Sequence, residues 1–113
     1  MHELSLTEKI LKIVLNAANA HQARQVKRIE IVLGDLSGVV SDSMEMYFEM
    51  IAKGTIAEEA VLEFTRERAR LYCGQCQAEY TKDPKNFFCP ICGNLGRFTD
   101  IGRECTIRNI EVE

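Results

Sequence analysis

Two CxxC pairs in the second half of the sequence constrain its fold more than any other feature. Cys73 and Cys76 form the first pair, and twelve residues separate it from the second pair, Cys89 and Cys92. Each pair puts two sulfurs on one tight turn, and two such turns complete the tetrahedral shell of four sulfurs that Zn²⁺ prefers. We therefore predict one structural Zn²⁺ ion held by these four cysteines, with no coordination position left open for catalysis.

Other uses of paired cysteines fit the sequence less well. A single CxxC is typical of a thioredoxin-like redox pair, but a doubled CxxC at this spacing is not. A nucleic-acid-binding zinc ribbon fits the spacing, yet few basic residues flank the cysteines and the net charge is −3, so we expect no nucleic-acid partner. Iron in a rubredoxin-like site would use the same four ligands, and the residues alone leave that alternative open.

A fifth cysteine, Cys105, belongs to neither pair. We interpret it as a small, half-buried residue at the start of a strand. The alternative is an exchangeable fifth ligand or a redox thiol.

The cysteine-bearing segment differs from the rest of the chain. Residues 71–100 hold both prolines and three of the seven glycines, with little helical or strand periodicity. A segment of this length cannot bury enough surface to fold without a bound metal or another cross-link. We therefore predict two domains: an α/β body made of residues 1–70 and 101–113, and a zinc-ribbon subdomain of residues 71–100.

The body segments show regular periodicity. Apolar residues at helical spacing predict helices over 6–21 and from about 42 to 53, and alternation predicts strands over 26–33, 60–68 and 106–112. The fold class should be α+β, with two helices packed on a small sheet of about three strands and a four-cysteine zinc ribbon inserted before the last strand.

Two capping boxes set the expected helix starts. Ser5 with Glu8 places the first start near residue 6, which leaves residues 1–4 outside the helix. Asp42 with Glu45 places the second start near residue 42. Along that second helix we interpret the three methionines, Met44, Met46 and Met50, as core filler.

The expected cellular compartment follows from two features that the sequence lacks. No apolar run approaches the ~18 residues that span a bilayer, and the N-terminus does not resemble a secretory signal. Paired cysteines in such a chain favour metal binding in a reducing compartment. We expect a cytoplasmic protein with no membrane partner, and a monomer or weak homodimer. No nucleophile pattern or phosphate-binding loop indicates an enzyme.

The first residues, Met1-His2-Glu3, offer a second set of metal donors. The Met1 amine, the His2 amide nitrogen and the His2 imidazole can chelate one ion, and a deprotonated amide nitrogen favours square-planar Ni(II) or Cu(II). A terminal histidine is nevertheless commonly solvated without any metal role. On these residues alone, a metal site and an incidental histidine both remain open.

Several motifs together resemble one known family. The sequence is similar to the HypA/HybF hydrogenase nickel-incorporation proteins nearly end to end. The resemblance lies in Met1-His2-Glu3-Leu4-Ser5, Ile31-Val32-Leu33-Gly34-Asp35-Leu36, Gly54-Thr55, the two CxxC pairs and Ile110-Glu111-Val112-Glu113. Members of the family often carry a carboxylate at the position of Val40, so an accessory acidic role is absent there.

The resemblance implies a function and a site. It implies a non-enzymatic metallochaperone that passes Ni(II) to the NiFe hydrogenase large subunit and works with a maturation GTPase. His2 would be the side-chain nickel ligand, Met1 and Glu3 would contribute mainly main-chain nitrogens, and the four cysteines would hold structural Zn²⁺. The alternative is a zinc-ribbon protein-interaction module that transfers no nickel and whose first residues are incidental.

Overall fold

The computed structural model describes residues 3–113, so the predicted ligands Met1 and His2 lie outside the described residues. The chain divides into two compact units. The first, called here the body unit, takes in the chain up to Val32, Val39–Thr65 and Thr106–Glu113. The second, the ribbon unit, takes in Leu33–Gly38 and Arg66–Cys105. Which segments fold as independent domains stays a prediction.

Two helices and six strands follow one another along the described chain. In order they are α1 (Glu3–Ala20), β1 (Val26–Gly34), α2 (Ser41–Ile51), β2 (Val61–Glu67), β3 (Arg70–Cys73), β4 (Ala78–Thr81), β5 (Arg97–Phe98) and β6 (Cys105–Val112). They form two three-stranded sheets, one in the order β2-β1-β6 and one in the order β4-β3-β5. The predicted α+β class is confirmed.

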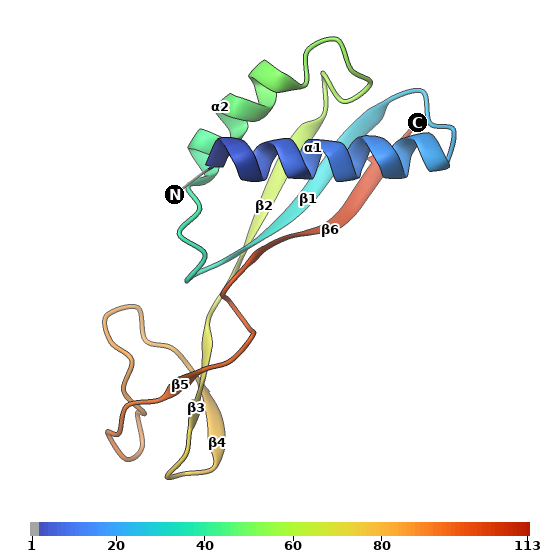
Figure 1. Ribbon diagram of the computed structural model, residues 1–113. Helices are drawn as coiled ribbons and strands as arrows, with labels where there is room; N and C mark the ends of the chain where they lie inside the picture. The colour runs from blue at the N-terminus through green and yellow to red at the C-terminus, as the bar shows by residue number, and fades with distance from the viewer. Residues whose placement is uncertain (1–2) are drawn as a thin grey trace. The chain divides into compact units, whose positions relative to one another are not determined.

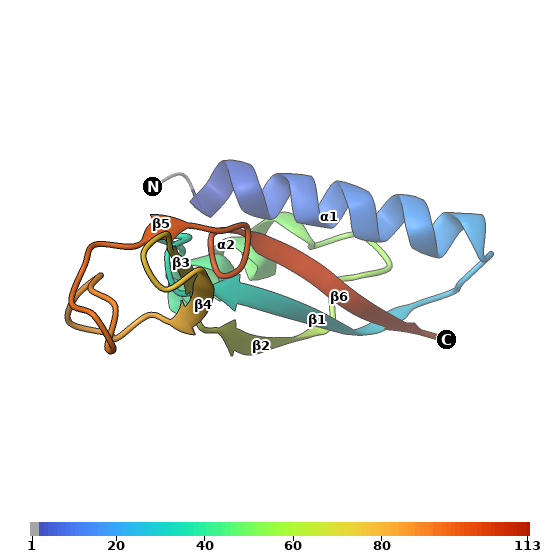
Figure 2. The same cartoon turned by 90° about the horizontal axis from the view of Figure 1, so that it is seen from below.

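The body unit is a layer of helices on one face of the β2-β1-β6 sheet. Figures 1 and 2 show α1 and α2 on the same side of the three strands. The middle strand β1 buries Ile29 and Ile31, as its alternating pattern predicted, but Val32 on the opposite face is buried as well. Helix α1 contributes Val14, which is fully buried. On the exposed face, Arg28 forms ion pairs with carboxylates of β1, β2 and β6.

Helix α1 begins earlier than the sequence predicted. Glu3 is its first residue, so Ser5 lies inside the first turn and does not cap the helix. Thr7, which is buried, donates its hydroxyl to the Glu3 carbonyl oxygen at 2.5 Å, one turn back. The prediction that residues 1–4 lie outside the helix is therefore wrong for Glu3 and Leu4.

Helix α2 also departs from its predicted start and packing. It begins at Ser41, its N-cap residue Val40 makes no side-chain cap, and Asp42 lies in the first turn. Met44 and Phe48 are buried, but Met46 and Met50 are 52 % and 62 % exposed. The interpretation of these last two methionines as core filler is wrong. The helix has apolar residues on more of its surface than the body unit covers, so some of them stay exposed.

The ribbon unit contains a second sheet that the sequence did not predict. β3 pairs antiparallel with β4, with Leu71 opposite Tyr80 and Cys73 opposite Ala78, and β5 pairs with the other edge of β3. These strands are two to four residues long. A span that short gives too few residues for alternation to be recognised.

No helix among residues 3–113 is both long enough and apolar enough to cross a membrane.

Candidate metal centre

The first CxxC pair lies where strand β3 turns into β4. Cys73 is the last residue of β3, and the turn that follows carries Cys76 back toward it. The Cys76 amide nitrogen lies 3.4 Å from the Cys73 sulfur and donates to it. Gln77 closes the turn with a left-handed φ of 53°. The hairpin thus holds two sulfurs on one turn, as the spacing predicted.

The second pair lies on a turn of its own. The Gly93 amide donates to the Cys89 carbonyl oxygen at 2.9 Å, and the Cys89 amide donates to the Asn94 carbonyl oxygen at 2.8 Å. Gly93 has a φ of +78°, a conformation that a residue with a side chain rarely adopts. Next to this turn, Phe88 pairs with Leu95 in an antiparallel bridge that closes the loop.

The two turns bring all four sulfurs together. The Cys73 and Cys92 sulfurs are 3.4 Å apart, those of Cys76 and Cys89 are 4.0 Å apart, and all four lie within 4.8 Å of one another. All five cysteines are free thiols. In a tetrahedral site with Zn–S bonds of ~2.3 Å, neighbouring sulfurs would lie about 3.8 Å apart. The spacing of the four sulfurs therefore fits a tetrahedral ion.

The thiols strongly influence one another's protonation. The amides of Cys92 and Ile91 donate to the Cys89 sulfur and lower the pKa of that thiol to about 7. Hydrogen bonding with the Cys92 sulfur, followed by desolvation, raises the pKa of the Cys76 thiol to about 12. The raised pKa keeps the Cys76 thiol protonated at neutral pH when no cation is bound. Binding of a divalent metal should therefore release protons, and acid should release the metal.

A small core supports the cluster. Leu71, Cys73, Tyr80 and Cys89 are buried together, and the Tyr80 hydroxyl donates to the Phe87 carbonyl oxygen at 2.5 Å. Gly96 lies so close to this tyrosine that an added Cβ would collide with the phenol oxygen. Sequence reasoning missed this support. Tyr80 lies on a strand of only four residues, which is too short for its alternation to be recognised in the sequence.

Of the predicted nickel ligands, the described residues include only Glu3. Its carboxylate accepts a hydrogen bond from the Val40 amide at 3.2 Å, which ties the start of α1 to the residue before α2. Its own amide is the first of the helix, and the first four N–H groups of an α-helix have no acceptor within it. Helix α1 thus provides no acceptor for the Glu3 N–H, although the helix begins earlier than predicted.

Comparison with known proteins places the chain in a family. A family model described as hydrogenase/urease nickel incorporation, metallochaperone, hypA matches residues 1–112. The chain belongs to the HypA family. The resemblance inferred from the sequence motifs is thereby confirmed, and the family description is that of a metallochaperone.

Relatives of the HypA family match over the whole chain. A hydrogenase maturation factor HypA of Dehalococcoides mccartyi (strain CBDB1) is 41 % identical over 113 residues, covering 100 % of this chain and 95 % of the relative. One of Caldanaerobacter subterraneus subsp. tengcongensis is 36 % identical over 114 residues, and 100 % of both chains is covered. A role in hydrogenase maturation follows for the family to which this chain belongs.

A solved structure of the HypA family supports the fold. The solution structure of the Ni metallochaperone HypA from Helicobacter pylori superposes with a TM-score of 0.73 at 21 % identity, covering 99 % of this chain and 97 % of that one. At this identity the likeness shows the fold alone. It agrees with two helices, small sheets and a four-cysteine ribbon.

Cys105 is not part of the four-cysteine cluster found among residues 3–113. It is the first residue of β6 and is partly buried, and this burial raises the pKa of its thiol. Both features favour the prediction of a small structural residue over a redox thiol, because reactive thiols have a lowered pKa.

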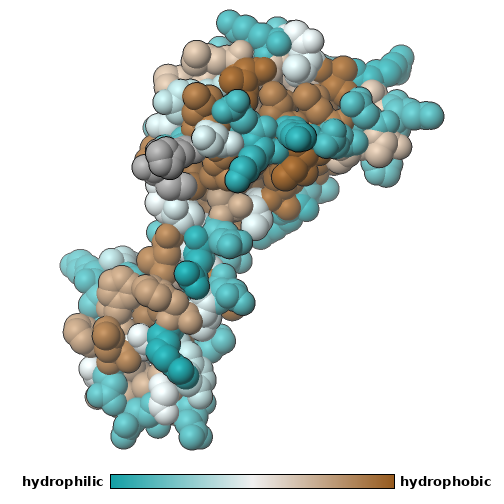
Figure 3. Space-filling view, in the orientation of Figure 1, coloured by the Kyte–Doolittle hydropathy of each residue, from teal (hydrophilic) through white to brown (hydrophobic). Residues whose placement is uncertain are grey.

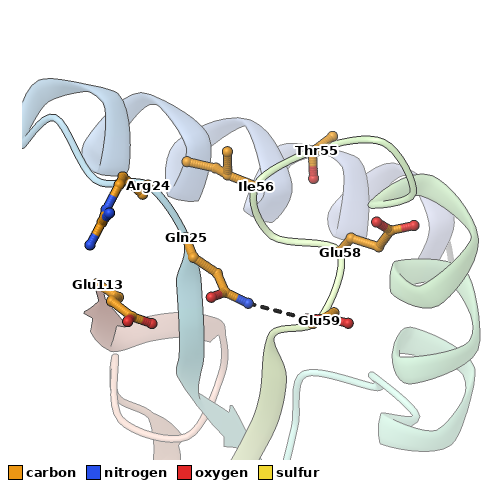
Figure 4. Close-up of a pocket in the computed structure, with 7 residues that line it drawn as sticks. All are labelled: Arg24, Gln25, Thr55, Ile56, Glu58, Glu59 and Glu113. Atoms are coloured by element: carbon orange, nitrogen blue, oxygen red, sulfur yellow. Dashed lines mark hydrogen bonds between the residues drawn. The ribbon is translucent and has the colours of Figure 1, made fainter.

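A pocket in the body unit lies where the chain end meets the start of β1 (Figure 4). The amides of Arg24 and Gln25 donate to the Glu113 carbonyl oxygen at 2.7 and 3.2 Å, and the Gln25 side chain donates to Glu59 at 3.3 Å. These hydrogen bonds join the residues just before β1 to the residue after β6 and to the loop before β2. The residues that line this pocket include neither cysteine nor histidine, so its lining offers no soft metal donors.

Proposed function

We propose that this chain binds Ni(II) at its N-terminus and delivers it to the NiFe hydrogenase large subunit, working with a maturation GTPase. The observation that carries the proposal is the match of residues 1–112 to a family described by nickel incorporation. The curated relatives named as hydrogenase maturation factors support the choice of hydrogenase as the recipient. The chain acts here as a carrier and catalyses no reaction.

The nickel donors are the Met1 amine, the His2 amide and imidazole nitrogens, and the Glu3 main-chain nitrogen. Four nitrogens of this kind favour a square-planar Ni(II) ion. Glu3 supports the assignment because its amide has no partner within α1 and its carboxylate is engaged with Val40. Cu(II) should bind the same donors at least as tightly, so selectivity depends on metal supply and on docking to the recipient.

The four cysteines hold a structural Zn²⁺ ion. The support is the fit of the four sulfurs to a tetrahedral shell, which leaves no position for a water or substrate. The ion fixes the two turns of the ribbon unit and takes no part in holding the nickel.

Calorimetric titration of Ni(II) into the zinc-loaded chain tests the nickel site. We expect one Ni(II) per chain in the wild type, and loss of this binding in His2→Ala and when extra residues precede Met1. The matched control is His21→Ala, since the chain has only two histidines. Unchanged affinity in the extended chain would refute the N-terminal site and favour a zinc-ribbon interaction module.

Transfer needs a separate measurement. Nickel-loaded chain is mixed with the purified large-subunit precursor, with and without the GTPase, and the nickel content of the precursor is measured. We expect the wild type to transfer nickel and His2→Ala to transfer none. If nickel reaches the precursor equally well from free Ni(II) at the same concentration, the chain is not the carrier.

A further inference from the structure

Strand β6 lies at an open edge of the body sheet. Among residues 3–113 its only neighbour in the order β2-β1-β6 is β1, and it is eight residues long. Backbone hydrogen bonds join both of its ends to the β1 side, from the Gly34 amide to the Glu104 carbonyl oxygen and from the Glu113 amide to the Gln25 carbonyl oxygen. The other side of an edge strand presents N–H and C=O groups that can pair with an added strand.

A groove, here called the β6 groove, runs along this strand beside α1. It is lined by residues 107–110 and Val112 of β6 and by Ala17, Ala18 and His21 of α1. Successive side chains of a strand point to opposite faces, so a groove that contacts four consecutive residues follows the edge of the strand. Figure 2 shows α1 and β6 side by side, and Figure 3 shows hydrophobic side chains among hydrophilic ones on the face that carries α1.

The size and the apolar wall of the β6 groove suit a peptide better than a small molecule. Its volume is about 270 Å³, below the ~300–1,000 Å³ of sites that bind small molecules. Glu111 pairs with Arg28 on the exposed face of the sheet, so Ile110 and Val112 point to the helix side. Val112 is still 39 % exposed there. Proteins that add a peptide strand to a sheet edge gain affinity from main-chain hydrogen bonds and specificity from pockets for alternate side chains.

The charge in the β6 groove favours an acidic peptide. Its lining contains Arg108 and a histidine but no carboxylate. No ion pair found in the described part of the chain involves Arg108. The one carboxylate of β6, Glu111, is on the other face with Arg28, and Glu104 and Glu113 lie beyond the ends of the strand. Arg108 is therefore available to a carboxylate of a partner.

The opposite edge of the sheet has a groove of the opposite charge. This second groove lies between α2 and the start of β2. Its lining contains no cation and four carboxylates, those of Glu45, Glu49, Glu58 and Glu59. An acidic peptide would be repelled there, so the charges direct it to the β6 edge.

We propose that β6 accepts an extended segment of a partner protein as a fourth strand of this sheet. The segment places an apolar side chain between Ala17 and Ile110, where the small alanine leaves room for it, and a carboxylate beside Arg108. A second copy of the chain fits less well, because its own β6 would bring a second Arg108 to the same groove. The contact does not depend on nickel binding and so goes beyond the proposed carrier function.

A titration of the zinc-loaded, nickel-free, ¹⁵N-labelled chain tests the proposal. The probes are octapeptides of alternating valine and threonine, blocked at both ends, with one glutamate at each position in turn. We expect the largest amide shifts in β6 and around Ala17, and binding at least about tenfold weaker when lysine replaces glutamate. Arg108→Glu should reverse this preference. The matched control is Lys12→Glu, the same kind of charge change at an exposed position outside the β6 groove.

N-methylated peptides test the strand pairing itself. Alternate N–H groups of an extended peptide point to opposite edges, so methylation of its odd residues blocks one edge and methylation of its even residues blocks the other. One of the two peptides should lose binding and the other should keep it. Ala17→Glu, which places a carboxylate in the groove, should abolish binding, whereas Ala20→Glu at an exposed position of α1 should not. Zinc content and circular dichroism verify that each variant is folded.

Several results would overturn the proposal. They are the absence of binding by every peptide, shifts that map to α2 and β2, and equal binding by the two methylated peptides. Shifts in β6 that depend on the concentration of the chain without any peptide would also overturn it, because a second copy would then occupy the edge. Since nickel is absent throughout, none of these outcomes bears on the proposed nickel site.

Discussion

The two sheets of this chain are stabilised in different ways. The β2-β1-β6 sheet of the body unit is covered by two helices and buries whole aliphatic side chains such as Ile29 and Ile31. The β4-β3-β5 sheet of the ribbon unit has a buried core of four residues, and two of them are the metal-site cysteines Cys73 and Cys89. The body has a hydrophobic core of the usual kind, whereas the ribbon has little core apart from its proposed ion.

Removal of zinc should have the largest effect, and it should be confined to the ribbon unit. Binding of structural zinc is worth an apparent ~10–16 kcal/mol in zinc-finger peptides, far more than four buried residues can supply. We expect a chelator, or acidification that protonates the thiols, to abolish hydrogen-exchange protection in β3 and β4 while β1 stays protected.

Cysteine variants provide the control for this prediction. Cys73→Ser should reduce the zinc content measured by mass spectrometry, whereas Cys105→Ser should leave it at one ion per chain, because Cys105 is outside the cluster. Protection of β3 and β4 that survives complete zinc removal would show that the ribbon is stable without its ion.

Truncation of a body core residue should have the next largest effect and should spare the ribbon. Phe48 is 3 % exposed, and Phe48→Ala should lower the free energy of unfolding by about 3–5 kcal/mol in a denaturant titration. Met50→Ala on the exposed face of the same helix should change it by less than about 0.5 kcal/mol. Equal losses in the two variants would mean that α2 packs differently from the structure described here.

The same contrast explains what could be predicted from the sequence. The body elements repeat their pattern over seven or more residues, long enough for the helical and alternating periods to be recognised. The ribbon strands are too short for that, and only the cysteine spacing indicated their place. The four cysteines could be predicted to converge because ligand spacing is a local property, whereas the support from Tyr80 and Gly96 depends on contacts across the ribbon.

The start of α2 could not be predicted because its N-cap residue makes a contact that is not local. Ser5 with Glu8 and Asp42 with Glu45 match a capping-box pattern, yet both first members lie inside helices. The Val40 amide before α2 instead donates to Glu3, which is 37 residues earlier in the sequence. A sequence window cannot contain such a partner. Likewise, the spacing of apolar residues predicted which face of α2 is buried, but it did not predict how wide the buried face is.

A smaller effect on zinc binding is expected from substitution of Gly96, which lies against Tyr80 in the ribbon core. In Gly96→Ala the new Cβ would collide with the Tyr80 hydroxyl, so the loop or the ring must shift and the bond to Phe87 is lost. Overpacking of this kind costs about 1–3 kcal/mol, which should weaken zinc binding between about fivefold and 150-fold in competition with a chromophoric chelator.

The ribbon offers a matched glycine as control for that variant. Gly74 has nothing within 4 Å of an added Cβ, so Gly74→Ala should leave zinc affinity unchanged within about twofold. If Gly96→Ala binds zinc as tightly as the wild type, Tyr80 does not support the metal centre and the ribbon tolerates more movement than its packing indicates.

The smallest effect should come from the exposed face of the body sheet. Arg28 donates to both carboxylate oxygens of Glu63 at 2.9 and 2.7 Å and forms ion pairs with Glu30 and Glu111, so one guanidinium links three strands. Hydrogen bonding to Glu63 raises the pKa of Arg28 above its ordinary value. Exposed ion pairs nevertheless contribute little, since water and salt screen them.

Arg28→Ala should lower the melting temperature slightly more than Lys27→Ala, a substitution of its exposed neighbour. The difference should vanish near 1 M salt, where the Debye length is about 3 Å. A difference that persists at high salt would instead come from packing of the arginine side chain on the sheet, and the body would then be stabilised on both of its faces.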